Sequence, residues 1–578
     1  MAVENLITEH IDIWTSAVKT KSASGRGSNK KLELYGVKKL RELILELAVR
    51  GKLVPQDPND EPASLLLERI AAEKAQLVKE KKIKKPKALP PINDSKPFQI
   101  PNNWGWSQLG FLTNYGVCDK LEPKDASPST WVLELEDVEK YTSRLLKKVR
   151  FEERVFKSTK NSFQKNDVIY GKLRPYLDKV LVADEDGACT TEMIPIRGYI
   201  GLMPEFIRLV LKTPYFIEYA NTSTHGMNLP RMGTDKARAA LFPLAPLNEQ
   251  HRIVAKVDEL MTLCDQLEQQ TEASIEAHQV LVTTLLDTLT NSADADELMQ
   301  NWSRISEHFD TLFTTEESID QLKQTILQLA VMGKLVPQDP SDEPADELLK
   351  RIAEEKAQLV KEKKIKKQKA LPPISEDEKP FELPSGWEWS KLQDLCFKIT
   401  DGEHSTPKRA ETGHYLLSAR NVTNEGIILG DVDYVPDYEF ARIRNRCDPN
   451  LGDILISCSG SVGRVALVDR DNAYSMVRSA AMIRPCNTNL IKEYLALMLR
   501  SPYLQFQMKN RSKQSAQANL FLGAISNLVG VIPPLSEQER IVSKVSQLLV
   551  ICDQLKSHLN DSRVTQLHLT DTIVEQVV

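Results

Sequence analysis

The chain has 578 residues, of which 41% are hydrophobic and 27% are charged, and its formal net charge is only −5. This composition is typical of a globular protein of about four domains, in which any contact with nucleic acid needs a local basic surface. No apolar run approaches the roughly 18 residues of a membrane span and the N-terminus lacks a signal peptide's apolar segment, so we expect a cytoplasmic protein without membrane contact.

The eight cysteines argue against a metal-binding or secreted protein. They include no CxxC pair and no close cluster with histidine. We therefore expect reduced thiols and neither a structural zinc ion nor a disulfide framework. The cysteines are Cys118, Cys189, Cys264, Cys396, Cys447, Cys458, Cys486 and Cys552.

The N-terminal part of the chain contains the first copy of a long internal repeat. Residues 47–92 return as residues 329–374 with about seven differences, at a constant spacing of 282. Residues 7–12 (ITEHID) resemble residues 305–310 (ISEHFD) at a spacing of 298. The extra residues of the first copy correspond to a Gly/Ser/Lys-rich stretch at 21–31, which has the composition of a linker.

Each copy of this repeat predicts two helices joined by a proline-containing turn. Residues 36–50 and 318–332 place apolar side chains at helical spacing, and Gly51 and Gly333 follow them as suitable left-handed caps. After the turn VPQDP, Asp60 and Asp342 are candidate N-caps for a second helix with one apolar stripe.

Both second helices end in the basic sequence KEKKIKK, at 79–85 and 361–367. The simpler interpretation is a solvated helix end, where cations interact favourably with the helix dipole. Contact with DNA phosphates is the alternative.

Two inserts that barely resemble each other lie between the repeated segments, at roughly 105–243 and 388–531. Short β-branched runs bounded by Gly, Asp or Pro predict strands at 167–171, 179–183, 453–457 and 463–468. Each insert later changes to a helical pattern, at 204–220 and 489–508. We expect α+β globules of one fold with diverged surfaces.

A second repeated motif opens two long helices. PLNEQHRIVAKV from Pro246 returns as PLSEQERIVSKV from Pro534. The capping-box pattern at 536–539, and a weaker version in the first copy, predict helices of about 40 residues at 248–290 and 536–578. Because the end of the chain corresponds to the place just before its start, the duplication is circular in phase and predicts a pseudo-twofold arrangement.

The chain lacks the motifs of enzymes that modify DNA or move along it. Its Pro-Pro pairs, at 90, 372 and 533, do not match the Asn/Asp-Pro-Pro-aromatic loop of an amino-methyltransferase. It has no GxxxxGK[ST] sequence, and 460–463 is only half of a dinucleotide fingerprint. No acidic pair with a nearby lysine forms a nuclease site. We therefore expect a non-catalytic chain.

The order of these features resembles the DNA specificity subunits of type I restriction-modification systems. The resemblance rests on the paired PLxEQxRIV segments, on GDILISCSGSVGRVALV from Gly452 and on SAQANLFLGAISNLVGVIPPL from Ser515, and it covers essentially the whole chain. It implies an α+β fold in which two α/β target-recognition domains are joined by long antiparallel helices. The helical repeats would be conserved regions that space these domains.

The resemblance also implies regions, partners and cofactors. The regions would be helical at 1–98, target-recognition domain 1 at 99–245, central helical at 246–384, target-recognition domain 2 at 385–533 and C-terminal helical at 534–578. The partners would be double-stranded DNA, two modification (methyltransferase) subunits and restriction (nuclease/translocase) subunits. S-adenosylmethionine, ATP and Mg2+ would bind to those subunits, and no cofactor would bind to this chain.

The sequence departs from the family pattern in two places. The first insert has GKLRPYLDKVLV where the second has GSVGRVALV, which suggests that the two inserts read different target classes. The long segment before Gly51 occurs only in some branches of the family.

Candidate DNA-reading residues are the polar and basic side chains of the insert loops, because such side chains read base edges in the major groove. The simpler alternative for each of them is a solvated loop. Residues 511–519 are the strongest candidate segment, because nothing in them could serve a hydrophobic core. The candidates are Lys172, Arg174, Tyr176, Thr190, Thr191, Asn228 and Arg231 in the first insert, and His404, Thr406, Lys408, Ser459, Ser461, Arg464, Arg511, Lys513, Gln514, Gln517 and Asn519 in the second.

Three functions remain open from the sequence. A DNA-binding adaptor with two recognition domains is favoured, and within that class an orphan methyltransferase without a nuclease is the alternative to a restriction system. A self-contained enzyme would be revealed by assaying the purified chain for methylation or cleavage. A coiled-coil scaffold without DNA contact is disfavoured by the loops rich in Arg, Ser and Gln.

Overall fold

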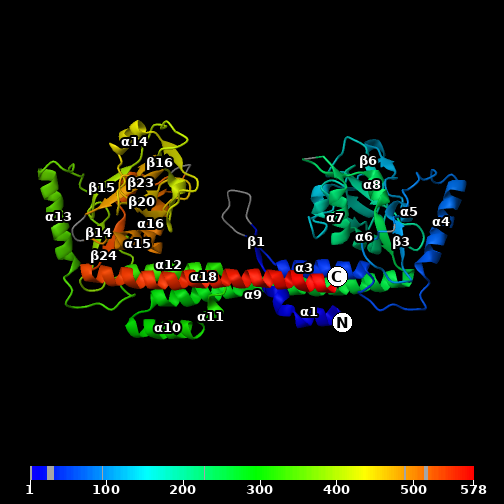
Figure 1. Ribbon diagram of the computed structural model, residues 1–578, viewed down its shortest axis with the longest axis horizontal. Helices are drawn as coiled ribbons and strands as arrows, with labels where there is room; N and C mark the ends of the chain where they lie inside the picture. The colour runs from blue at the N-terminus through cyan, green and yellow to red at the C-terminus, as the bar shows by residue number, and fades with distance from the viewer. Residues whose placement is uncertain (1–2, 22–30, 94, 227, 487–489, 513–517) are drawn as a thin grey trace. The chain divides into compact units, whose positions relative to one another are not determined.

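The computed structural model describes residues 3–21, 31–93, 95–226, 228–486, 490–512 and 518–578 (Figure 1). The chain divides into two compact units. Unit 1 consists of Met1–Ser274 and Ser562–Val578, and unit 2 consists of Ile275–Asp561. Two long helices, α9 (Leu247–Asn291) and α18 (Leu535–Val577), each contribute to both units. None of the helices in the described ranges is both long and apolar enough to cross a bilayer.

Each unit combines a helical framework with one insert. The framework of unit 1 has α1 (Val3–Glu9), α2 (Ile11–Ser16), β1 (Lys19–Lys21), β2 (Lys31–Glu33), α3 (Tyr35–Val49) and α4 (Ala63–Lys79). The framework of unit 2 has α10 (Ala295–Glu307), α11 (Phe309–Leu312), α12 (Glu316–Val331), α13 (Ala345–Lys361) and η4 (Glu376–Glu378). The long helices complete each framework.

The two inserts contain the following elements. Insert 1 has β3 (Gly105–Gln108), α5 (Leu109–Leu112), β4 (Lys120–Leu121), η1 (Pro123–Asp125), β5 (Trp131–Leu133), η2 (Leu135–Asp137), β6 (Lys160–Phe163), β7 (Val168–Gly171), η3 (Pro175–Leu177), β8 (Val180–Val182), β9 (Gly187–Cys189), β10 (Met193–Ile196), α6 (Pro204–Leu211), α7 (Pro214–Thr222), β11 (Thr224–His225), β12 (Arg231–Met232), α8 (Thr234–Ala239) and β13 (Leu241–Leu244). Insert 2 has β14 (Glu388–Lys391), β15 (Cys396–Asp401), β16 (His414–Leu417), η5 (Ala419–Asn421), β17 (Val422–Thr423), β18 (Gly426–Ile427), β19 (Asp433–Val435), α14 (Asp437–Arg444), β20 (Ile454–Ser457), β21 (Val465–Leu467), β22 (Tyr474–Met476), β23 (Ala480–Pro485), α15 (Lys492–Arg500), α16 (Pro502–Ser512), α17 (Leu522–Ser526) and β24 (Val529–Ile532).

Both inserts mix helices with mainly antiparallel strands, which confirms the predicted α+β class, and they share several strand pairings. A central strand pairs with an antiparallel neighbour on each side, β7 between β10 and β8 and β20 between β23 and β21. A single parallel pair follows the same pattern, β5 with β9 and β16 with β22. The first and last strands of each insert pair with each other, β3 with β13 and β14 with β24. Each insert therefore closes on itself where it leaves the framework.

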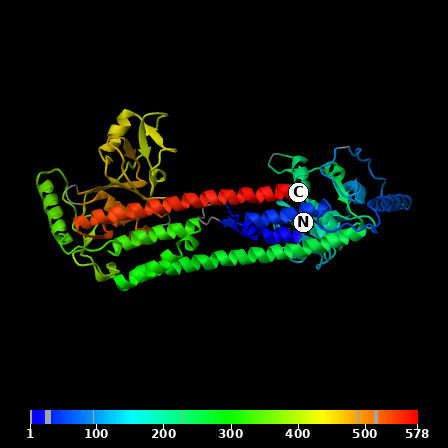
Figure 2. The ribbon, with the colours of Figure 1, turned by 60° about the horizontal axis from the view of Figure 1, so that its bottom comes forward.

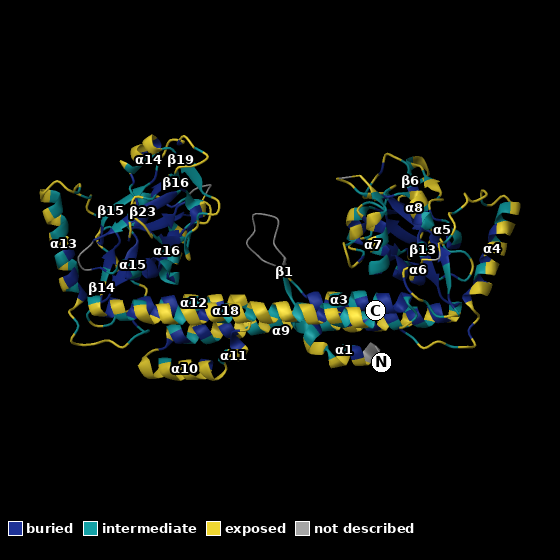
Figure 3. Cartoon of the chain, viewed as in Figure 1, coloured by how far each residue is buried: buried dark blue, intermediate teal, exposed yellow. Residues whose placement is uncertain are grey.

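The central strands β7 and β20 are fully buried. Figure 3 shows the cores of both inserts in dark blue. All four residues of Val168–Gly171 and all four of Ile454–Ser457 are buried. This burial explains why these strands read as continuous apolar runs in the sequence rather than as alternating patterns.

In each unit, one framework helix lies along both long helices. In unit 1, α3 meets α9 where Arg41 pairs with Asp265 and Glu268, and it meets α18 where Tyr35 donates a 2.7 Å hydrogen bond to Asp571 (Figure 2). In unit 2, α12 meets α18 through Lys323–Asp553 and Lys556–Asp320, and meets α9 through Gln321–Thr283.

Gly51 ends α3 as the sequence predicted. Its φ is +67°, and the following amide, Lys52 N, donates to Leu47 O at 2.9 Å. A Cβ at Gly51 would lie 2.4 Å from Pro101 Cγ, so only glycine fits this close approach. Gly333 ends α12 in the same way, with a φ of +68°.

The predicted N-caps Asp60 and Asp342 are wrong. The helices that follow them begin at Ala63 and Ala345, and their N-cap residues are prolines without a side-chain cap. The Asp60 carboxylate instead accepts from Arg252 at 2.6 Å, and Asp342 is bound by Arg540 of the second long helix at the same distance. Both carboxylates, which local spacing assigned to helix caps, are therefore used in long-range ion pairs.

The predicted capping box at 536–539 is also wrong, because α18 begins at Leu535, before Ser536. Glu537 faces the core and accepts from Trp387 Nε1 at 2.9 Å and from Gln338 at 2.6 Å. Burial raises the pKa of Glu537, while the two donors lower it.

Glu249 makes the same contacts at the start of α9. Its carboxylate accepts from Trp104 Nε1 at 2.9 Å and from Gln56, and burial is again the main cause of its raised pKa. The next residue, Gln250, accepts from Met203 N at 3.1 Å and donates to Ala245 O at 3.0 Å. The repeated EQxR sequence is therefore a joint between the long helix, the framework turn and the insert.

The single helix predicted at 204–220 is interrupted at Thr213. Thr213 caps α7 by accepting from Phe216 N, and Pro214 follows it. In insert 2, α15 ends before Ser501, and α16 begins at Pro502. A proline cannot supply the amide that would continue the first helix.

The joint at the start of α9 can be tested by replacing Trp104 with Phe, which removes one donor to the buried Glu249. We expect the free energy of local opening to fall by about 1–3 kcal/mol, because a buried carboxylate oxygen loses its partner. Hydrogen exchange of residues 245–255 should accelerate, while that of residues 533–543 should stay as in the wild type.

Trp387→Phe is the matched control. It should accelerate hydrogen exchange of residues 533–543 and leave that of residues 245–255 as in the wild type. Equal acceleration at both helix starts in either variant, or at neither, would contradict the assigned role of the joint.

Candidate nucleic-acid interface

In each unit, predicted DNA-reading residues gather on the connection between two neighbouring strands. The connection joins β7 to β8 in unit 1 and β20 to β21 in unit 2. Each connection passes through two left-handed positions, Arg174 (φ +51°) and Asp178 (φ +48°) in unit 1, and Gly460 (φ +72°) and Gly463 (φ +89°) in unit 2. This conformation costs a non-glycine residue about 1 kcal/mol or more. The unit 1 connection therefore needs contacts that hold it.

A largely buried lysine supplies these contacts. The Lys212 side chain is 11% exposed, and its ammonium pairs with Asp178 and donates to Ser143 Oγ at 2.8 Å and to Tyr141 O at 3.1 Å. Ser143 Oγ donates to Asp178 O at 2.6 Å and accepts from Val180 N at 3.0 Å. Burial raises the pKa of Asp178 to about 6 against the attraction of Lys212. Its Oδ1 is buried and has no hydrogen-bond partner in the described part of the chain.

Unit 2 fastens its connection with different side chains in the same places. Arg500, at the end of α15, donates from Nε and Nη2 to Val465 O at 3.2 and 3.0 Å. Asn424 Oδ1 accepts from Val465 N at 2.9 Å. Since Val465 and Val180 each begin the second strand of the pair, Asn424 takes the part that Ser143 plays in unit 1.

Three segments that carry predicted residues meet in unit 1. Lys172 N donates to Glu192 O at 3.0 Å, in the turn between β9 and β10, and Arg174 N donates to Pro230 O at 2.7 Å. Arg231 Nε closes the group by binding the Glu192 carboxylate at 2.9 Å. The structure thus brings onto adjoining segments the predicted residues Lys172, Arg174, Tyr176, Thr190, Thr191, Asn228 and Arg231.

Unit 2 brings the corresponding segments together. Ser459 and Asn519 form an antiparallel backbone bridge, and Arg231 forms the equivalent bridge in unit 1. Arg464 Nη2 donates to Ser461 Oγ at 2.8 Å, within the same connection. Ser459, Ser461 and Arg464 of one connection therefore share a surface with Asn519, which lies in a distant part of the sequence.

The predicted residues His404, Thr406 and Lys408 lie on another exposed loop of insert 2. This loop adjoins the turn between β22 and β23, because Glu403 O accepts from Arg478 N at 3.0 Å. His404 Nε2 lies 2.7 Å from Asp401 Oδ2, and Arg446 binds the same carboxylate. The backbone amide of Lys408 donates to the carboxylate of Glu439 at 3.3 Å. The side chain of His404 thus lies against the ion pair of Arg446 and Asp401.

The segment 511–519 is only partly described. Arg511 binds Glu378 and Ala524 O, each at 3.3 Å, so its guanidinium makes contacts within unit 2. Asn519 lies on the surface described above. The predictions for Lys513, Gln514 and Gln517 fall outside the described residues.

Comparison with known proteins gives one consistent result. The sequence profile of the type I restriction modification DNA specificity domain matches residues 384–562. The chain is 41% identical over 599 residues to the type I restriction enzyme EcoAI specificity subunit of Escherichia coli, covering 100% of both chains. It is 42% identical to the EcoEI specificity subunit of Escherichia coli, covering 100% of this chain and 99% of the relative. The chain belongs to the type I restriction enzyme specificity subunits.

A solved structure supports the same fold at lower identity. It comes from work on complex assembly and conformational transition of a type I R-M system. The TM-score is 0.53 at 18% identity, and the match covers 83% of this chain and 99% of that one.

Sequence reasoning missed one exposed arginine of this specificity subunit. Arg478 lies in the turn between β22 and β23, where Cys458 N donates to Ser479 O at 2.8 Å. Lys172 N makes the same contact with Glu192 O in unit 1, so Arg478 occupies the place of Thr191. No local motif marks this position, and only comparison of the two inserts in the folded chain identifies it.

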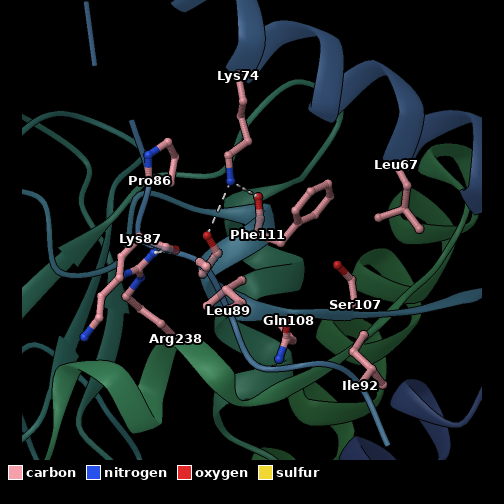
Figure 4. Close-up of a pocket in the computed structure, with 12 residues that line it drawn as sticks. Leu67, Lys74, Pro86, Lys87, Leu89, Ile92, Ser107, Gln108, Phe111 and Arg238 are labelled. Carbon is pink, nitrogen blue, oxygen red and sulfur yellow. Dashed lines mark hydrogen bonds between the residues drawn. The ribbon is translucent and has the colours of Figure 1, made fainter. Parts of the chain in front are cut away.

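A pocket of about 510 Å3 lies between α4 and insert 1 of the specificity subunit (Figure 4). Lys74 points into it from α4 and donates to Phe111 O at 2.7 Å and to Gly110 O at 3.4 Å. Burial, aided by the nearby charge of Arg238, lowers the pKa of Lys74 to about 8. In unit 2, Lys356 donates in the same way to Gln393 O at 2.7 Å. We therefore assign the pocket to a structural joint between α4 and the insert.

The basic run after α4 is exposed. Lys82 pairs with Glu80, and Lys87 pairs with Asp235 of α8. Contact of this run, or of its counterpart at 361–367, with phosphates stays a prediction.

The role of Lys212 can be tested with Lys212→Met, which leaves Asp178 without its cation. We expect a loss of about 3 kcal/mol in the stability of insert 1, because an uncompensated polar group remains buried. Hydrogen exchange of residues 139–143 and 172–179 should accelerate.

Arg500→Met in unit 2 is the matched control, and we expect a smaller loss of about 1–2 kcal/mol because only a backbone carbonyl loses its donor. Wild-type exchange of both segments in Lys212→Met would show that the ion pair does not hold the connection.

Proposed function

We propose that this specificity subunit reads a bipartite, asymmetric DNA site, with one half-site for each insert. The proposal is carried by one observation: the two inserts build the same surface and fill equivalent positions with different side chains. Arg231 corresponds to Asn519, and Thr191 corresponds to Arg478. Arginine pairs with guanine edges, whereas asparagine pairs with adenine. Two inserts that share this backbone arrangement but carry different side chains at equivalent positions would select different half-sites.

The duplicated framework supports duplicated partners. The joints at Glu249 and Glu537 have the same partners in both units. We infer that each unit docks one modification subunit, and that restriction subunits complete the assembly on DNA. S-adenosylmethionine, ATP and Mg2+ would serve those subunits, which would carry out methylation and cleavage, while this chain supplies recognition.

The region boundaries follow the same proposal. Residues 99–245 and 385–533 would form the two target-recognition domains, and the remaining three regions would form the framework. The long helices would run antiparallel as a spacer about a pseudo-twofold axis. If both inserts approach one face of the duplex, the half-site centres would lie about 34 Å or roughly ten base pairs apart.

The modular assignment predicts the result of an insert exchange. Replacing residues 105–243 with those of a relative that has a different target should change one half-site and leave the other intact, because insert 1 closes on itself through β3 and β13. Genome-wide methylation mapping of a host that carries the system would measure both half-sites at once.

Replacing residues 388–531 is the reciprocal control and should change only the other half-site. If both half-sites changed together in either exchange, the proposal of two independent readers would be wrong.

A further inference from the structure

A turn that the sequence did not single out adjoins the candidate interface of unit 1. Val138 and Leu145 form an antiparallel bridge, and Glu139 N donates to Arg144 O at 2.8 Å. The intervening turn passes through left-handed residues, Tyr141 at a φ of +69° and Ser143 at +60°. We call residues 139–144 the second turn.

The second turn is fastened directly to the β7–β8 connection. Tyr141 N donates to Leu177 O at 2.8 Å, and Ser143 Oγ donates to Asp178 O at 2.6 Å. Lys212 holds both pieces, since its ammonium contacts Tyr141 O, Ser143 Oγ and the Asp178 carboxylate. The two segments therefore form one rigid surface element.

Left-handed non-glycine residues concentrate at this element. Of the eight in the described chain, four lie here: Tyr141, Ser143, Arg174 and Asp178. Such conformations persist where the surroundings over-determine them, and they cluster at functional sites. Their concentration here therefore indicates a functional site, and the exposed side chains of the element are the candidates for binding a ligand.

Those side chains suit a polyanion. The Tyr141 side chain is 49% exposed, and Tyr176 on the adjoining connection is 43% exposed. The ammonium of Lys140 lies 5.7 Å from the Tyr141 ring centroid, and the Arg144 guanidinium is exposed on the same turn. Glu139 offsets part of this charge, because it lies 3.4 Å from Arg144 and accepts from Thr142.

Insert 2 has a shorter and less basic turn at this place. Val422 pairs with Ile427, and Thr423 pairs with Gly426, so the turn is two residues shorter. Its tip is Asn424 and Glu425, and the Asn424 side chain is used to bind Val465 N. The second turn is therefore a feature of insert 1.

We propose that the second turn is a further DNA-contacting segment of insert 1, in which Tyr141 and Arg144 bind the phosphate backbone of the duplex. The proposal rests on the proposed function and extends its surface. Arginine and tyrosine side chains are regular donors to phosphate oxygens, and such contacts fix the register of a reader on the duplex. Insert 1 would thus hold its half-site through more backbone contacts than insert 2.

The test uses the full chain assembled with its modification subunits and a duplex carrying the site found by methylation mapping. The double variant Tyr141→Ala/Arg144→Ala should bind this duplex about tenfold more weakly, with a salt dependence whose slope is lower by about one. Because both side chains are exposed, hydrogen exchange of the insert core should stay as in the wild type.

Lys124→Ala is the matched control. Lys124 is exposed and follows β4 in the chain. β4 and β5 form the two opposite edges of the four-stranded sheet, and the second turn follows β5 in the chain. This variant should bind within about twofold of the wild type.

Two outcomes overturn the inference and are distinguishable. Wild-type affinity and salt slope in the double variant would show that the second turn does not contact DNA, while specific binding by the wild-type complex would leave the proposed function standing. A wild-type complex that fails to prefer the mapped site over an unrelated duplex would overturn the proposed function as well.

Discussion

The structure of each unit depends on one buried carboxylate at the start of a long helix. Glu249 and Glu537 are 0% and 1% exposed, and each accepts a hydrogen bond from the tryptophan that immediately precedes the insert and from a glutamine of the framework turn. Burying a carboxylate is costly unless donors surround it. The insert, the turn and the helix must therefore be in place together, which fixes how each insert leaves its framework.

This constraint accounts for the pattern of repetition in the sequence. The joint needs a specific carboxylate, an adjacent amide and an arginine three residues later, so both copies carry EQxR. The loops of the candidate interface take no part in this joint, so they are under no such geometric constraint. Different loops can occupy the same frame, and the two inserts do differ at their equivalent positions.

The sequence predicted local features well. The glycine ends of α3 and α12, the buried strands β7 and β20 and the α+β class depend on short-range conformational preferences, which local patterns report. Asp60 was misassigned as a cap because its partner, Arg252, lies 192 residues away. No local pattern identifies an ion pair at that separation.

The candidate interface was predictable in part for the same reason. The loops after β7 and β20 stand out by composition, and the structure places predicted residues of each insert on adjoining segments. Arg478 and the second turn were missed, because their relation to these loops exists only through backbone contacts between distant segments. Arg511 shows the converse, since this basic residue in a polar stretch contacts Glu378 and Ala524 within unit 2.

The central claim is that equivalent surfaces of the two inserts each contact one half-site. The most direct measurement places a photo-cross-linking amino acid at Tyr176 in one chain and at Ser461 in another, on the assembled complex bound to its mapped duplex. The account predicts that position 176 cross-links to one half-site only and that position 461 cross-links to the other only. Cross-links from both positions to the same half-site, or only to DNA outside the site, would contradict it.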